Sequence, residues 1–153
     1  MGHWPGQANN QKTTFGNLSR SELMSRVRST GNQTTETRLK ILFRKEGIKG
    51  WRRHIRLPGK PDFAWPELGI VLFVDGCFWH GHNCGKNLFP KTNPEEWLSK
   101  IAGNKRRDRR VNRQLRKMGW SVLRVWECQL REPEFCLNRI KKALSSQRIR
   151  NLD

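Results

Sequence analysis

Four cysteine and histidine side chains are spaced so that they could hold a metal ion. Three fall within eight consecutive residues of a glycine-bearing loop, and the fourth ends a later apolar run: Cys77, His82, Cys84 and Cys128. Three thiolates and one imidazole are typical of a closed, tetrahedral zinc site that supports a fold rather than a reaction. Two alternatives are open, because His80 could replace His82 and Cys136 could replace Cys128. The competing interpretation is a set of ordinary buried cysteines beside surface histidines.

Carboxylates form a second candidate site. Asp62 follows Pro61 at the start of one predicted strand, and Asp75 ends the next. Carboxylates at neighbouring strand ends suit Mg2+, which in a DNA-binding protein would polarise a phosphate and activate a water molecule. His80 follows Cys77 by three residues, and an imidazole suits general-base chemistry near neutral pH. Turn capping is the other common use of aspartate at such positions.

The basic residues indicate a polyanionic partner. The 153-residue chain has 31 Lys and Arg against 13 Asp and Glu, a formal net charge of +18. Nine of the basic residues lie between positions 100 and 117: Lys100, Lys105, Arg106, Arg107, Arg109, Arg110, Arg113, Arg116 and Lys117. So one-sided a run is typical of a phosphate-binding surface, which favours nucleic acid over a membrane. Asp108, the one acid among them, either relieves repulsion beside Asn104 and Asn112 or orients a catalytic group.

Three aromatic residues lie close to these candidate sites in the sequence. Phe78 and Trp79 are adjacent in the cysteine-containing loop, so both cannot face one core from an extended segment. Trp97 lies near the start of the basic helix, where it could instead pack with Leu98 and Ile101. Exposed apolar side chains beside positive charge can wedge between base steps of a duplex.

The elements that must position these residues alternate along the chain. Helical spacing predicts helices over residues 19–28, 35–46, about 93–118 and about 133–144. Strand patterns cover residues 51–57, 62–65, 70–75 and 120–126. Thr34 and either Thr92 or Asn93 are expected helix caps. The continuously apolar run 70–74 predicts a central strand, joined to 62–65 as a hairpin. The expected fold is α/β, with a mixed sheet flanked by helices.

Composition and length narrow the classes of protein further. A length of 153 residues fits one domain, and we expect a flexible polar arm over residues 1–17 before a single domain over residues 18–153. No apolar run approaches the roughly 18 residues of a membrane span, and the N-terminal segment lacks the pattern of a secretory signal. The expected location is the cytoplasm, where the cysteines would be reduced or metal-bound.

These segments together resemble the very short patch repair (Vsr) DNA mismatch endonucleases. The resemblance covers about residues 19–130 and is carried by residues 57–63, 74–80, 107–110, 119–123 and 125–128. It implies a fold of the PD-(D/E)xK nuclease type. It also implies Mg2+-dependent nicking of one strand, 5′ of the thymine in a T:G mismatch that arises by deamination of 5-methylcytosine. The implied partner is double-stranded DNA carrying that mismatch, bound by a monomer with a functional link to a cytosine-5 methyltransferase.

The resemblance also assigns roles by position. Asp62 would be the magnesium ligand and His80 the general base, supported by Asp108 and Glu36. The DNA wedge would consist of Phe78, Trp79 and Trp97. The structural zinc would be bound by Cys77, His82, Cys84 and Cys128. Independently of the resemblance, we expect phosphates to be held by the basic helix, including Lys105, Arg106, Arg107, Arg109 and Arg110, and by the strand containing Arg52 and Arg53.

Two departures from the family pattern bear on the mechanism. Some relatives have Thr-His where this chain has Val74-Asp75, so Asp75 either joins the metal site or replaces a hydrogen-bonding histidine. The lysine of a standard PD-(D/E)xK site is also absent, since Cys77 occupies the position two residues after Asp75. The absence of this lysine makes His80 more important to any nuclease mechanism in this chain. The alternatives are a restriction-type endonuclease of the same fold and a non-catalytic, zinc-stabilised DNA-binding protein.

Overall fold

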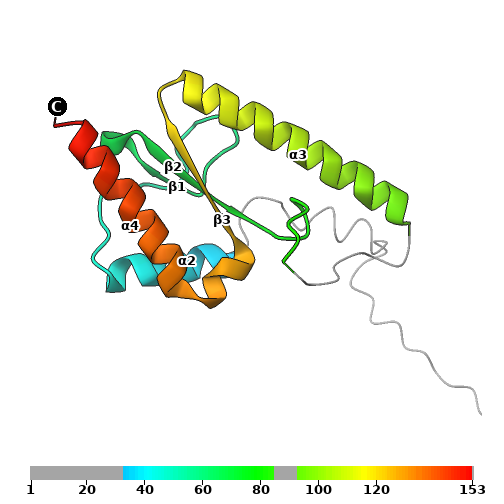
Figure 1. The fold of residues 1–153 in the computed structure, drawn as a ribbon, viewed down its shortest axis with the longest axis horizontal. Coiled ribbons are helices and arrows are strands. Elements are labelled where there is room, and N and C mark those ends of the chain that lie inside the picture. The colour runs from blue at the N-terminus through cyan, green and yellow to red at the C-terminus, as the bar shows by residue number, and fades with distance from the viewer. Residues whose placement is uncertain (1–32, 85–92, 153) are drawn as a thin grey trace, which may run out of the picture.

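A computed structural model describes residues 33–84 and 93–152. Its elements follow one another as α2 (Gln33–Lys45), β1 (Phe63–Trp65), the 3-10 turn η1 (Pro66–Leu68), β2 (Ile70–Asp75), α3 (Pro94–Lys117), β3 (Ser121–Trp126), the 3-10 turn η2 (Glu127–Arg131) and α4 (Pro133–Arg150). Figure 1 shows α3 on one side of the sheet, and α2 and α4 on the other. The predicted α/β class, a mixed sheet flanked by helices, is confirmed.

Among the described residues, the sheet has three strands in the order β1-β2-β3. β1 and β2 form the predicted hairpin, antiparallel with Phe63 opposite Leu72. β3 then runs parallel to β2, from Ile70 opposite Ser121 to Asp75 opposite Trp126. β2 is central and five of its six residues are buried, which explains its continuously apolar sequence.

Two hydrophobic layers cover the two faces of the sheet, because successive strand residues point to opposite sides. The smaller layer packs α3 on the sheet through Val111 and Leu115, against Val71 and Phe73. The larger layer joins α2, α4 and the other face; its buried members are Leu39, Phe43, Ile48, Phe63, Trp65, Ile70, Leu72, Val125, Leu130, Cys136, Leu137, Ile140 and Leu144. These two layers fix α3 and the ends of the strands relative to one another.

The predicted strand over residues 51–57 is wrong. Only Arg52 pairs with the sheet, through an isolated bridge to Ala64. The backbone is left-handed at Gly50 (φ 79°) and at His54 (φ 57°), and left-handed residues cannot continue an extended strand.

The helices differ from the prediction mainly at their ends. α2 begins at Gln33, so Thr34 lies inside the helix instead of capping it. Asn93 precedes α3 in a left-handed conformation (φ 52°) without a side-chain cap, and Thr92 lies outside the described residues, as does the helix predicted over 19–28. α4 continues to Arg150 rather than ending near Leu144.

Within the two described ranges, no helix combines the length and apolar character needed to cross a membrane.

Candidate active site and metal centre

A cavity of about 250 Å³ lies where the end of β2 meets α3 and β3. Its acidic lining residues are Asp62, Asp75 and Asp108, and its basic ones are Lys60, Arg107 and Arg124, with His80 beside them. Gly59 permits the close approach of the preceding turn to α3, since a Cβ there would lie 2.5 Å from a methyl of Val111. The cavity thus gathers the predicted Asp62, Asp75, His80 and Asp108 from four separate segments.

Asp62 is held at the cavity by the hairpin. The backbone N–H of Val74 donates to its Oδ2 at 2.6 Å, because the antiparallel register puts the start of β1 beside the end of β2. Burial raises the pKa of Asp62 to about 6; the Val74 hydrogen bond opposes this effect, and the charge of Asp75 adds to it. A cation bound here would favour the ionised carboxylate. A half-buried carboxylate that lines the same cavity as a second one therefore fits a Mg2+ ligand.

His80 lies between two carboxylates. Its Nδ1 is 2.6 Å from Oδ2 of Asp108, while its Nε2 is 3.7 Å from Oδ1 of Asp75. Burial would raise the pKa of Asp108, but the hydrogen bond and charge of His80, followed by the charges of Arg124 and Arg107, lower it overall. Asn104 and Asn112 have other partners, namely the Trp79 carbonyl and Arg124. Of the two interpretations of Asp108, the geometry favours orientation of His80.

Sequence reasoning missed Arg124, which contacts both of these carboxylates. Its Nη1 donates to Oδ2 of Asp75 at 2.7 Å, and its Nη2 is 3.4 Å from Oδ1 of Asp108. A charged residue inside the apolar β3 sequence is the signal that could have found it, because buried charges require partners.

Glu36 is placed differently from the predicted supporting group. It is buried in α2 and forms an ion pair with Arg53, and it does not line the cavity. Arg53, one of the expected phosphate anchors, in turn lies over the Phe63 ring, 5.8 Å from its centroid. Its positive charge acts on Asp62 and lowers that pKa, against the dominant effect of burial.

Three aromatic rings form a cluster, and one of them, Trp79, directly precedes His80 of the cavity lining. The centroid of Phe78 lies 5.1 Å from that of Trp79 and 5.4 Å from that of Trp97, and the two tryptophans are 5.6 Å apart. All three are half-buried and belong to neither core layer. Asn104 of α3 donates to the Trp79 carbonyl at 2.8 Å, which fixes the loop to the helix. The ring cluster, defined by these three residues, is therefore a surface feature held next to α3.

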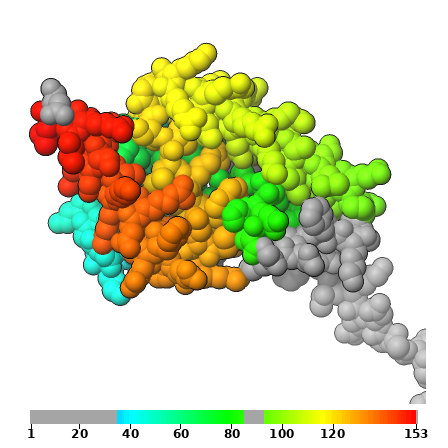
Figure 2. Space-filling model, viewed as in Figure 1, coloured from blue at the N-terminus to red at the C-terminus, as the bar shows by residue number. Residues whose placement is uncertain are grey.

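The basic face of α3 runs on from the ring cluster. Five predicted DNA contacts are all exposed: Lys105, Arg106, Arg107, Arg109 and Arg110. In Figure 2 the loop of residues 76–84, in green, reaches the surface beside α3, in yellow-green. α3 therefore contributes residues to all three features: the exposed basic surface, the cavity lining and the ring cluster.

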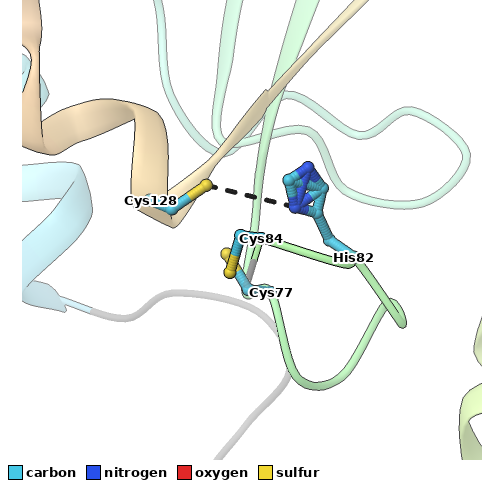
Figure 3. A group of neighbouring side chains, drawn as sticks. All are labelled: Cys77, His82, Cys84 and Cys128. Atoms are coloured by element: carbon cyan, nitrogen blue, oxygen red, sulfur yellow. Dashed lines mark hydrogen bonds between the residues drawn. The ribbon is translucent and has the colours of Figure 1, made fainter. Parts of the chain in front are cut away.

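The four expected zinc ligands converge at one place. The ligand atoms of Cys77, His82, Cys84 and Cys128 all lie within 4.8 Å of one another. Figure 3 shows three of them on the loop after β2 and Cys128 on η2, with its Sγ 4.0 Å from Nδ1 of His82. Three sulfurs and an imidazole could hold a metal ion, and such soft donors match Zn2+.

The two alternative ligands are occupied elsewhere. Cys136 is buried in the larger core layer, where burial raises its pKa to about 11, and His80 faces Asp108. Burial also raises the pKa of Cys77, to about 12. A bound cation would reverse that shift, because a metal binds the thiolate.

Comparison with known proteins identifies the family to which the chain is similar. Residues 13–86 match the family model for DNA mismatch endonuclease Vsr. The type II nicking enzyme V.NmeAIP of Neisseria meningitidis is 36% identical over 132 residues, which cover 84% of this chain and 91% of the relative. DNA mismatch endonuclease Vsr of Escherichia coli is 43% identical over 116 residues, 76% of this chain and 74% of the relative. The type II nicking enzyme V.XorIIP of Xanthomonas oryzae is 42% identical over 112 residues, 72% of this chain and 81% of the relative.

Proposed function

The chain belongs to the Vsr family of DNA mismatch endonucleases, and from that premise we propose that it nicks one strand of duplex DNA 5′ of the thymine in a T:G mismatch. The observation that carries the proposal is His80. It is held at 2.6 Å from Asp108, in the cavity that Asp62 lines, and it directly follows Trp79 of the half-buried ring cluster. A general base, a metal ligand and a DNA-distorting surface are thereby adjacent.

The chain's own residues divide the reaction as follows. The exposed basic residues of α3 bind phosphates, and the ring cluster tests how readily a base pair unstacks. A wobble pair costs less to separate than a Watson–Crick pair, which is a source of selectivity. Asp108 accepts a hydrogen bond from Nδ1–H of His80, so that Nε2 presents its lone pair to the cavity and can take a proton from water. The developing imidazolium is stabilised by the Asp108 carboxylate. Glu36 acts at a distance, by holding Arg53.

Two metal ions complete the proposal. Asp62 would hold Mg2+, with Asp75 facing the same cavity, and the bound ion would polarise the scissile phosphate and acidify water. Cys77, His82, Cys84 and Cys128 would hold Zn2+ as a closed structural site. The loop of residues 76–84 carries His80 as well as three of the four proposed zinc ligands. The zinc site would therefore fix the position of the general base.

The remaining parts of the proposal combine what the resemblance to the family implies with what the composition of the chain suggests. The α/β fold is assigned to the PD-(D/E)xK nuclease type, and the enzyme acts as a monomer in the cytoplasm. Its T:G substrates would arise where a cytosine-5 methyltransferase has modified DNA that is later deaminated. The products would carry a 3′-hydroxyl and a 5′-phosphate.

The test is an end-labelled duplex that contains a T:G pair, incubated with purified protein in Mg2+ or in EDTA. A T:A duplex of the same sequence is the control, and the mismatch is placed in several sequence contexts. We expect a Mg2+-dependent nick in one strand of the mismatched duplex alone. Cleavage of both strands of the paired control would favour a restriction-type endonuclease. Binding without a nick in any context would leave a non-catalytic DNA-binding protein.

A further inference from the structure

The turn before β1 holds a lysine in a backbone conformation that side chains rarely adopt. Lys60 has φ 51° and follows Gly59, which has φ 74°. A left-handed residue other than glycine is uncommon, and Lys60 also precedes Pro61, a position where extended backbone is preferred. Glycine or asparagine would adopt this conformation at a lower energetic cost. The side chain of Lys60 is therefore what calls for an explanation.

Contacts on both sides of Lys60 fix the turn in this conformation. The N–H of Lys60 donates to the carbonyl of Leu57 at 3.0 Å, and the N–H of Asp62, two residues later, donates to a carbonyl of β2 at 3.0 Å. Gly59 lies so close to α3 that a Cβ there would be 2.5 Å from a methyl of Val111. Strained residues persist where their surroundings fix them in this way, and they cluster at functional sites.

Lys60 lines the cavity, and its charge is placed differently from that of Arg124 in the same lining. The guanidinium of Arg124 donates to Asp75 at 2.7 Å and to Asn112 at 3.1 Å. Within the described part of the chain, the ammonium of Lys60 has no hydrogen-bond or ion-pair partner, and the residue is exposed. The charge of Lys60 is thus available to a ligand, whereas that of Arg124 is used within the protein.

The acidic residues of the cavity restrict which ligand can use this charge. Asp62, Asp75 and Asp108 line the same cavity, so an anion that enters alone is repelled. A DNA phosphate accompanied by a divalent ion meets this condition, because the ion offsets the carboxylate charge. Lysine binds phosphate as a point charge on a flexible stem, which adapts to the position of the ligand.

We propose that Lys60 is a further catalytic residue, whose ammonium binds a non-bridging oxygen of the phosphate that is cut. The inference rests on the proposed nicking function, since it assigns to that reaction a residue beyond Asp62 and His80. The ammonium neutralises charge on the phosphate while water attacks, and it forms and breaks no bond itself. A preorganised cation at such a position acts on the transition state. The strained turn is then explained by the need to present a cation at the wall of the cavity.

Two competing explanations of Lys60 have different consequences. A lysine that only anchors DNA contributes to affinity and to its salt dependence, but not to the rate of the bound complex. A lysine that only supports the turn contributes to folding, so its removal lowers the melting temperature. The rate at saturating protein, the dissociation constant and the melting temperature therefore separate the three roles.

The first test compares Lys60→Gln and Lys60→Arg with wild type in single-turnover nicking at saturating protein. We expect the rate to fall about 100-fold in Lys60→Gln, as for the loss of one preorganised donor. Lys60→Arg should keep most of the rate, because it retains a cation that binds phosphate. Lys142→Gln, which removes an exposed lysine from α4, is the control and should equal wild type. Weaker binding with a wild-type rate in Lys60→Gln would make Lys60 an anchor and overturn the proposal.

The melting temperature tests whether Lys60 is present for folding. Lys60→Gly removes the side chain and tolerates the left-handed backbone, so its melting temperature should equal that of wild type or exceed it by up to about 4 °C. Its nicking rate should nevertheless fall as far as that of Lys60→Gln. A rate loss accompanied by a lower melting temperature in both variants would overturn the proposal in favour of a structural role.

Sulfur substitution at the cut bond tests which atom Lys60 contacts. A phosphorothioate replaces one of the two non-bridging oxygens, and each replacement is a separate diastereomer. We expect one diastereomer to slow wild type by a factor at least about fivefold larger than the factor by which it slows Lys60→Gln, because the variant has already lost the contact. Equal factors in the two proteins for both diastereomers would overturn the proposal.

Acetylation of lysine side chains gives an answer that does not need nicking. The Asp62→Asn protein, which is expected to bind DNA without cutting it, is briefly acetylated in Mg2+ with and without a T:G duplex and analysed by mass spectrometry. We expect bound DNA to abolish most acetylation of Lys60 and to leave that of Lys142 unchanged. Unchanged acetylation of Lys60 overturns the proposal. Protection of Lys60 by a duplex that the wild-type protein does not nick would instead overturn the proposed function.

Discussion

Nδ1 of His80 and Oδ2 of Asp108 lie 2.6 Å apart although 28 residues separate them in the sequence. The contact exists because the loop after β2 packs tightly on α3. Gly81 (φ 62°) makes this possible, since a Cβ there would lie 2.6 Å from Cε of Lys105 and 2.7 Å from a methyl of Ile101. The helix that carries the basic surface thus also orients the proposed general base.

Replacement of either partner in this contact should slow nicking without weakening DNA binding. We expect His80→Ala to lower the single-turnover rate by about 100- to 10,000-fold, as for the loss of a general base. Asp108→Asn, which keeps a hydrogen-bond acceptor but loses the charge, should lower it by about 10- to 100-fold. Binding to a T:G duplex in EDTA is the control. A wild-type rate in His80→Ala would remove His80 from the reaction.

The fold was predictable from sequence wherever a local pattern determined it. The apolar run of β2 indicated a central strand, and the basic, amphipathic run of α3 indicated a long helix. The strand predicted over residues 51–57 was wrong because the alternation of residue types there reflects alternating exposure and not an extended backbone. The left-handed backbone at Gly50, just before the segment, and at His54, inside it, prevents a continuous strand, and the alternation gives no sign of either.

The site was predictable where its members share one loop or have an unusual type for their surroundings. Spacing alone suggested Cys77, His82 and Cys84, and Asp108 was conspicuous as one acid in a basic run. Arg124 escaped prediction because its partners come from β2 and α3, and only the tertiary register brings them to it. The placement of Glu36 on Arg53 depends on long-range packing in the same way.

Loss of one thiol from the metal cluster should release the metal and loosen the loop that carries His80. We expect wild-type protein to contain about one zinc per chain and Cys84→Ser to contain none, with a lower melting temperature and no nicking, because structural zinc contributes directly to folding. Elemental analysis and thermal denaturation measure both. Asp62→Asn and Cys136→Ala, which lie outside the cluster, should retain the metal. Full zinc content in Cys84→Ser would contradict the assignment.

In the metal-free protein, the ionised carboxylate of Asp62 should lower the free energy of unfolding at neutral pH. Its pKa of about 6 in the folded chain exceeds the roughly 3.9 of an unfolded aspartate. Its stabilising contribution is therefore complete below about pH 4 and is lost as the pH rises through about 6. In EDTA at pH 7.5, Asp62→Asn should raise the free energy of unfolding by up to about 3 kcal/mol while abolishing nicking. At pH 4 the two proteins should be nearly equal in urea denaturation.

In the same experiment, Asp108→Asn should change the free energy of unfolding in the opposite direction. The pKa of Asp108 is lowered in the folded protein, so its carboxylate contributes stability above the unfolded pKa that is lost as the pH falls. Asp108→Asn should therefore be less stable than wild type at pH 7.5. If the free energy of unfolding changed equally and with the same sign in Asp62→Asn and Asp108→Asn, stability would depend on the total charge of the cavity. The different surroundings of the two carboxylates would then not explain it.

The exposed arginines of α3 should determine how DNA binding depends on salt. Arg106, Arg109 and Arg110 are exposed on this helix, and each phosphate contact that is lost should make the slope of log K against log salt shallower by about 0.9. We expect a single Arg109→Gln change to weaken binding to mismatched and paired duplexes equally. Arg148→Gln on α4 should leave the slope unchanged. An unaltered slope in Arg109→Gln would remove this residue from the phosphate-binding surface.

The ring cluster should act on mismatch discrimination and leave folding largely unaffected. Trp97 contacts Phe78 and Trp79 and belongs to neither core layer, so Trp97→Ala should have nearly the melting temperature of wild type. Its affinity for a T:G duplex should fall by about 10- to 100-fold, the equivalent of one lost base–aromatic stacking contact of 1–3 kcal/mol. Its affinity for the paired T:A duplex should change much less, because binding there depends on phosphates.

Leu98→Ala is the matched control for this last change. Leu98 adjoins Trp97 on α3 and is 48% exposed, so its truncation removes neighbouring apolar surface without touching the ring cluster. We expect its ratio of affinities for T:G and T:A duplexes to equal that of wild type. If Trp97→Ala and Leu98→Ala kept the same ratio, selectivity would have to come from contacts in the cavity, and the ring cluster would be only a support for the loop that carries His80.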